Sequence, residues 1–126
     1  MVKYYKCKHC GQIVLMVKET KVPILCCGEE MVELTPNSTD AVGEKHVPVI
    51  ERNGHLVTVK VGSVPHPMIK EHYIEWITLE TNKGTQTKKL SYDQAPEATF
   101  LIAEDEVILS AYEYCNLHSL WVKNKD

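Results

Sequence analysis

Four cysteines in the first 37 residues restrict how this chain can fold more than any other feature. Two residues separate Cys7 from Cys10, and fifteen residues separate Cys10 from the adjacent pair Cys26-Cys27. Four thiolates suffice to complete a tetrahedral shell around iron or zinc. A segment of this length is near the size at which a hydrophobic core alone fails to hold a fold. We therefore expect residues 1–37 to form a small domain held together by a metal ion.

Disulfide formation explains the same cysteines less well than metal binding does. Neighbouring Cα atoms lie about 3.8 Å apart, whereas a relaxed disulfide needs roughly 4.4–6.8 Å, so a Cys26–Cys27 bond would be strained. The adjacent pair also lacks the two-residue spacer of zinc ribbons, which predicts a distorted tetrahedron. A closed shell of four thiolates leaves no position for substrate, so the site would transfer electrons or stabilise the domain. His9 would be a redundant fifth ligand, and we expect it to be exposed.

Composition excludes several classes of function. A net charge of −3 argues against a nucleic-acid-binding protein, which normally carries a basic stripe. The sequence contains neither a stretch of 18 apolar residues nor the apolar region of a signal peptide, so we expect a cytoplasmic protein without membrane contact. In that reducing compartment, clustered cysteines are more often metal ligands or catalytic groups than disulfides.

Residues 38–126 have the repeated period-two pattern of β-strands. Residues 36–40 form the expected linker before this second domain, and Asn53-Gly54 predicts a tight hairpin turn. The sequence predicts an all-β chain in which the small metal domain precedes an immunoglobulin-like antiparallel β-sandwich of about seven strands. The expected strands are residues 46–51, 56–61, 73–79, 85–90, 98–103, 107–114 and 119–123.

A second group of metal-ligating residue types is spread over this domain. Its members lie in expected loops or near strand ends, and they are His46, His66, His72, Cys115 and His118. Pro65 and Pro67 stiffen the chain on both sides of His66, so its imidazole can be aimed. His55 has no such support, and we expect it to be an ordinary residue at a strand edge.

Both halves of the chain resemble known proteins. Residues 7–12 and 26–31 are similar to desulforedoxin and to the N-terminal domain of desulfoferrodoxins, which implies an Fe(Cys)4 centre and a homodimer. The second half resembles the catalytic domain of superoxide reductases, the family that includes desulfoferrodoxin and the shorter neelaredoxin. The resemblance implies two irons per chain. It makes the four histidines His46, His66, His72 and His118 the equatorial ligands of a square-pyramidal ferrous site, with Cys115 as the axial ligand.

The implied activity is reduction of superoxide, with one electron and two protons, to hydrogen peroxide without release of oxygen. Rubredoxin or a similar small protein would return the electron. Four neutral imidazoles, one thiolate and Fe(II) sum to a charge of +1, which attracts superoxide although the chain is acidic. Lys45 would add a positive charge at the mouth of the site. Glu44 resembles the carboxylate that takes the open iron position in the ferric state.

Two other functions compete with this interpretation. Cys115-x2-His118 with an upstream histidine on a β-sandwich is similar to blue-copper ligation, which would make the chain a non-catalytic electron carrier. That alternative lacks a methionine shortly after His118, and it leaves His66 and His72 without a role. A zinc-stabilised interaction module is the third possibility, in which the histidines would be incidental.

Overall fold

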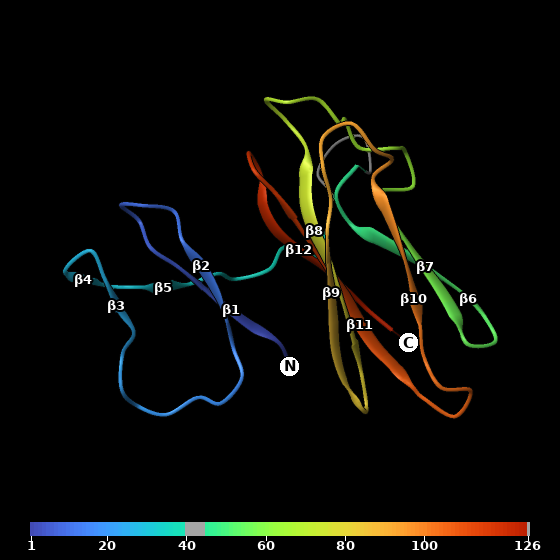
Figure 1. Ribbon diagram of the computed structural model, residues 1–126, viewed down its shortest axis with the longest axis horizontal. Helices are drawn as coiled ribbons and strands as arrows, with labels where there is room; N and C mark the ends of the chain where they lie inside the picture. Colours follow the sequence, from blue (N-terminus) through green and yellow to red (C-terminus); the bar gives the residue numbers. More distant parts are fainter. Residues whose placement is uncertain (40–44, 126) are drawn as a thin grey trace. The chain divides into compact units, whose positions relative to one another are not determined.

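The computed structural model describes residues 1–39 and 45–125, and every regular element in this part of the chain is a β-strand (Figure 1). The chain divides into two compact units, Met1–Thr35 and Pro36–Asp126. Neither described range contains a helix with the length and hydrophobicity of a membrane span. The strands are β1 (Lys3–Lys6), β2 (Ile13–Met16), β3 (Leu25–Cys26), β4 (Glu29–Glu30), β5 (Val32–Glu33), β6 (Pro48–Asn53), β7 (Leu56–Val61), β8 (Ile74–Thr81), β9 (Gly84–Lys89), β10 (Glu97–Leu101), β11 (Ile108–Cys115) and β12 (Ser119–Asn124).

The first unit is a three-stranded sheet in the order β2-β1-β5 with a separate hairpin formed by β3 and β4. Its pairings are antiparallel, and Tyr4 lies opposite Leu15 in the central pair. Tyr4, Cys7 and Met31 are among its few buried side chains. So small a set of buried groups matches the expectation that this unit depends on a further stabilising element.

The second unit is a sandwich of two antiparallel sheets, ordered β12-β11-β8-β9 and β10-β7-β6. Its core contains the alternate residues of β7 together with Ile74, Ile77 and Leu79 of β8 and Phe100 of β10, all of them fully or almost fully buried. This alternation arises because successive side chains of a strand point to opposite faces. The predicted all-β fold is confirmed, and the ends of the seven strands lie within two residues of the expected ones.

The hairpin between β6 and β7 lies one residue further along than predicted. Asn53 pairs with Leu56 as the last strand pair, so the two-residue loop is Gly54-His55 and not Asn53-Gly54. Gly54 has a φ of +64°, which glycine adopts without the steric cost that a Cβ imposes. His55 is exposed in this loop.

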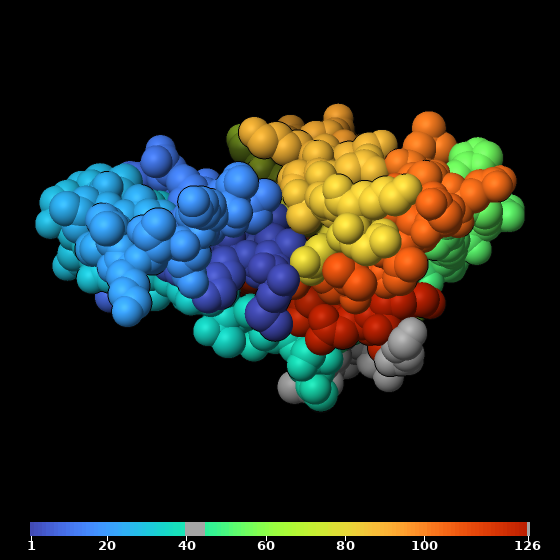
Figure 2. All heavy atoms as spheres, turned by 90° about the horizontal axis from the view of Figure 1, so that it is seen from below, coloured from blue at the N-terminus to red at the C-terminus, as the bar shows by residue number. Residues whose placement is uncertain are grey.

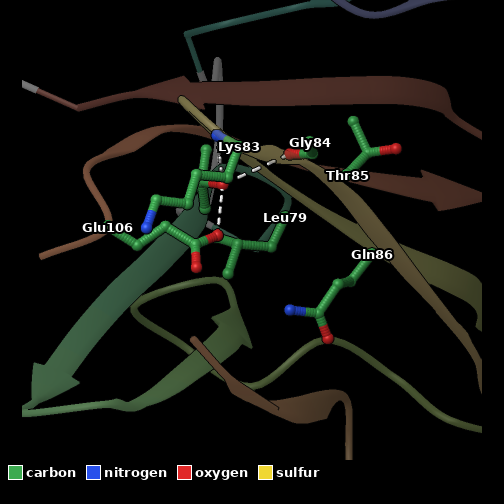
Figure 3. Close-up of a pocket in the computed structure, with 7 residues that line it drawn as sticks. Leu79, Lys83, Gly84, Thr85, Gln86 and Glu106 are labelled. Carbon is green, nitrogen blue, oxygen red and sulfur yellow. Dashed lines mark hydrogen bonds between the residues drawn. The ribbon is translucent and has the colours of Figure 1, made fainter. Parts of the chain in front are cut away.

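One lateral margin of the sandwich is closed by side chains of β9. Gln86 donates a hydrogen bond to the backbone oxygen of Leu101 at 2.9 Å, and Lys88 donates to that of Thr99, so β9 satisfies carbonyls of the edge strand β10. At the β8–β9 turn, Thr81 donates to Glu106 and to the Gly84 oxygen, beside the hollow drawn in Figure 3. Figure 2 shows the yellow atoms of this hairpin next to orange atoms of the segment after β10.

Replacing Phe100 with alanine should lower the free energy of unfolding of the second unit by about 3–5 kcal/mol, because it leaves a cavity in the core. Phe100 is completely buried, whereas its neighbour Leu101 is 66% exposed. Leu101→Ala is therefore the matched control and should change the stability by less than about 0.5 kcal/mol. Urea titration followed by tryptophan fluorescence measures both variants, since Trp76 and Trp121, the two tryptophans of the chain, lie in this unit. Equal unfolding midpoints would contradict the assignment of the core.

Candidate metal centres

The four cysteines of the first unit converge on one point. Their sulfur atoms all lie within 4.8 Å of one another, all four are free thiols, and the Cys10 and Cys26 sulfurs are 3.6 Å apart. Sulfurs at about 2.3 Å from a metal at the corners of a tetrahedron are separated by roughly 3.8 Å. The four sulfurs therefore have the spacing that a tetrahedral ion requires.

Two adjacent cysteines reach the same point because of a tight hairpin. Cys26 pairs with Glu29, so Cys27 and Gly28 form the two-residue loop between β3 and β4. Both loop residues have positive φ angles, +54° for Cys27 and +73° for Gly28. Residues other than glycine rarely adopt such angles, and two in succession reverse the chain as in a type I′ turn. A strained backbone at Cys27 is thus the local cost of placing two neighbouring sulfurs in one cluster.

The electrostatics of this cluster favour a cation. Hydrogen bonds from the backbone, led by the Cys10 N–H at 3.5 Å from the sulfur, lower the pKa of Cys7 to about 6. Hydrogen bonds with Cys7 and then Cys10 raise the pKa of Cys26 to about 12, and they also raise the pKa of Cys27. One thiolate is therefore favoured and further negative charges are resisted. A bound metal ion would compensate the charge of all four thiolates.

The second cluster is assembled from segments far apart in the sequence. His46 precedes β6, His66 and His72 lie between β7 and β8, Cys115 ends β11, and His118 follows in the turn before β12. One donor atom from each of these residues lies within 4.8 Å of every other. The structure thus brings together all five residues that the sequence proposed for this site.

The four imidazole rings form a closed cycle. Centroid distances are 4.9 Å from His46 to His66, 4.7 Å from His66 to His72, 5.1 Å from His72 to His118 and 4.7 Å from His118 back to His46. Each ring meets the next edge to face, with interplanar angles of 68° to 81°. Nitrogens about 2.1 Å from one ion at the corners of a square would place neighbouring ring centres roughly 4.6 Å apart. The cycle therefore fits four ligands in one plane.

Two buried nitrogens of this cycle, one on His66 and one on His72, lack hydrogen-bond partners in the described part of the chain. The Nδ1 of His66 is 2.7 Å from the Pro67 carbonyl, to which it donates, so its Nε2 is an acceptor. Among the described residues, neither this Nε2 nor the Nε2 of His72 has a hydrogen-bond partner. A buried polar atom without a partner costs about 1–3 kcal/mol. A metal ion would coordinate both nitrogens. These two unpartnered nitrogens are the strongest structural indication that the second cluster binds a metal.

Burial also keeps these ligands in the form that a metal binds. Desolvation lowers the pKa of His66 to about 4 and lowers that of His72 as well, so both rings are neutral near pH 7. Desolvation raises the pKa of Cys115, whose side chain is completely buried and whose sulfur is 3.8 Å from Nδ1 of His118. A cation at the centre of the cluster would reverse that shift and favour the thiolate.

Trp121 is a residue of this site that the sequence analysis did not identify. Its indole stacks on the His46 ring with centroids 4.6 Å apart and an interplanar angle of 15°. Its Nε1 donates to the backbone oxygen of His118 at 2.9 Å. A tryptophan three residues after a proposed ligand is the only signal in the sequence that could have indicated this contact.

The remaining predicted residues lie at the margin or outside the clusters. Lys45 is exposed beside His46, and its charge adds to burial and to His118 in lowering the pKa of His72. Glu44 lies outside the described residues. His9 is exposed, as expected, and its Nε2 is 2.8 Å from a carboxylate oxygen of Glu29. His55 belongs to neither cluster.

Comparisons with known proteins agree with this arrangement of residues. Residues 38–124 match the family model described as desulfoferrodoxin. A desulfoferrodoxin homolog of Archaeoglobus fulgidus is 46% identical over 121 residues, covering 96% of this chain and 95% of that protein.

Solved structures give the same result. The crystal structure of the superoxide reductase from Treponema pallidum has a TM-score of 0.86 and 41% identity, with 98% of each chain covered. A single-iron superoxide reductase from Giardia intestinalis has a TM-score of 0.57 and 32% identity, covering 67% of this chain and 99% of its own. By sequence and by fold, this chain belongs to the desulfoferrodoxin family.

Proposed function

We propose that this chain is a superoxide reductase. It would transfer one electron to superoxide, which takes up two protons and leaves as hydrogen peroxide, and no oxygen would be released. The observation that carries the proposal is the convergence of four imidazoles and one buried thiol within 4.8 Å. The superoxide reductase of Treponema pallidum, which is similar over 98% of this chain, supports it.

The five residues of the second cluster would hold the iron, whose ferrous form supplies the electron. The two buried members, His66 and Cys115, fix the buried side of the site, whereas His118 is exposed. A small anion would therefore approach from the exposed side of the cluster, away from the buried Cys115. Water has access from the same side and would supply the two protons.

Charge around the site favours an anionic substrate. With four neutral imidazoles and one thiolate, the ferrous site carries a net charge of +1, and Lys45 adds another positive charge. This local field opposes the net charge of −3 of the whole chain. We assign Lys45 to attraction of superoxide and to ordering of water, and Glu44 to the role of a carboxylate that occupies the substrate position between turnovers.

The first cluster would bind a second iron through Cys7, Cys10, Cys26 and Cys27. Its four thiolates close the coordination shell, so it can relay electrons or stabilise the unit but offers no position for substrate. The single-iron relative from Giardia intestinalis matches 67% of this chain, which supports placing the chemistry in the second unit. A rubredoxin-like protein would return the electron, and the enzyme would act as a cytoplasmic homodimer.

The electron-carrier alternative is less well supported. Blue-copper ligation uses two histidines and one cysteine, with a weak axial ligand. His66 and His72 lie in the same cluster as His46 and His118, and such a site would leave two of these four rings without a function.

The anaerobic ferrous protein, exposed to a flux of superoxide, should produce hydrogen peroxide and no oxygen. Peroxide and dissolved oxygen are measured together, with metal analysis of the same sample. Two irons per chain are expected, whereas one copper would indicate the carrier and zinc alone the interaction module. Oxygen formed in equal yield to peroxide would mean dismutation and would refute the proposal.

Two cysteine variants should separate the roles of the clusters. Cys115→Ser should abolish superoxide reduction because it removes the only thiolate of the second cluster. Cys27→Ser should bleach the absorption of the first centre and leave superoxide consumption largely intact. Each variant is the control for the other, and iron content is measured for both. Equal losses of activity would contradict the division of roles.

Lys45→Ala should slow the second-order reaction about threefold at low ionic strength. That factor corresponds to the energy of roughly 0.6 kcal/mol between unit charges about 7 Å apart in water. The difference should vanish toward 1 M salt, where the Debye length falls to about 3 Å. Lys123→Ala, which removes the same charge from an exposed position on β12, is the matched control. A loss that does not depend on salt would assign Lys45 to proton transfer instead.

A further inference from the structure

The side chain of Asn116 forms hydrogen bonds with the backbone on both sides of His72. Its Oδ1 accepts a hydrogen bond from the backbone N–H of Tyr73 at 3.0 Å, and its Nδ2 donates to the backbone oxygen of Glu71 at 3.0 Å. These two groups belong to the residues immediately before and after His72. The backbone N–H of Asn116 also donates to the oxygen of Tyr73 at 3.3 Å. One residue therefore makes three hydrogen bonds to the neighbours of a proposed ligand.

Asn116 itself lies in the turn that carries two other proposed ligands. It directly follows Cys115 and precedes His118 by two residues. The contacts with Glu71 and Tyr73 span 45 and 43 residues of sequence. The asparagine therefore joins the loop before β8 to the turn between β11 and β12, and each of these segments supplies a donor to the cluster.

His72 needs such a support because its own backbone is used elsewhere. Its N–H and oxygen form a reciprocal pair with Ile69 at 3.0 Å, which closes the small loop of residues 69–72. These two backbone hydrogen bonds fix the shape of the loop, but they do not fix its distance from the turn between β11 and β12. The ring of His72 lies 5.1 Å from that of His118, and its buried Nε2 has no partner in the described part of the chain.

We propose that Asn116 is a positioning residue, which fixes His72 against the Cys115–His118 turn and so preorganises the iron ligands. An amide suits this role because it offers a donor for one backbone group and an acceptor for the other. Groups that orient metal ligands typically contribute 10- to 100-fold to metal affinity. The inference rests on the proposed function in one respect, that the second cluster binds iron.

The test compares Asn116→Ala, Asn116→Asp and the control Leu117→Ala in the full-length, iron-loaded chain. Leu117 lies in the same turn, and its side chain is 60% exposed. Competition with a ferrous chelator gives the affinity of the second cluster, and Mössbauer quadrupole splitting reports the symmetry of its ligands. The Fe(Cys)4 signal of the same sample is the internal reference.

Asn116→Ala should weaken iron binding about 10- to 100-fold and change the splitting. Asn116→Asp should lose less iron affinity than Asn116→Ala. A carboxylate still accepts the hydrogen bond from the Tyr73 N–H, although it cannot donate to the Glu71 oxygen. Leu117→Ala should match the unaltered chain in both measurements. Unchanged affinity and splitting in Asn116→Ala would overturn the proposal, and if that variant does not fold, the same result in Asn116→Asp would do so.

The outcome is separable from the proposed activity. If the unaltered chain binds iron but yields no peroxide from superoxide, the activity is wrong, and the affinity comparison still decides the role of Asn116. If the chain reduces superoxide and the Asn116 variants bind iron normally, the activity stands and the positioning role is wrong.

Discussion

The arrangement of the second unit depends on holding four imidazoles and one buried thiol close together, with the buried Nε2 atoms of His66 and His72 left without hydrogen-bond partners among the described residues. Such groups are costly to bury, and thiolates or imidazolium ions at these distances repel one another. His66 and His72 meet this constraint as neutral rings, and Cys115 meets it as a protonated thiol. A bound cation would coordinate these donors and remove the cost of burying them. This gain contributes to the free energy of metal binding.

The sheets make that arrangement possible by fixing which chain ends meet. Ile74 at the start of β8 pairs with Cys115 at the end of β11, so the loop carrying His72 and the turn carrying His118 lie at one end of the four-stranded sheet (Figure 1). The register shifts between Tyr114 and Cys115, and such an irregularity re-aims the side chain that follows it. The pairing of β8 with β11 therefore contributes to the site through the register that it fixes.

The strands were predictable from sequence because successive side chains of a β-strand point to opposite faces. Segments such as residues 56–61 show this directly as residues of alternating burial. Turn position was less accurate, since Asn53 ends a strand pair and the loop begins at Gly54. The ligand sets followed from residue types together with resemblance to a known family. Asn116 and Trp121 could not be found in this way, because their roles depend on contacts formed only when distant segments meet in the folded chain.

Exposure and charge vary across the cluster in a way that suits a small anionic substrate. Cys115 and His66 are buried, whereas His118 is exposed and Lys45 lies at the solvent side. Burial strengthens electrostatic interactions among the ligands because the local dielectric is low, while the open side leaves a path for superoxide and water. The chain as a whole carries a charge of −3, so attraction of an anion must come from this local field. A buried ligand set that is open on one side thus reconciles an acidic protein with a negatively charged substrate.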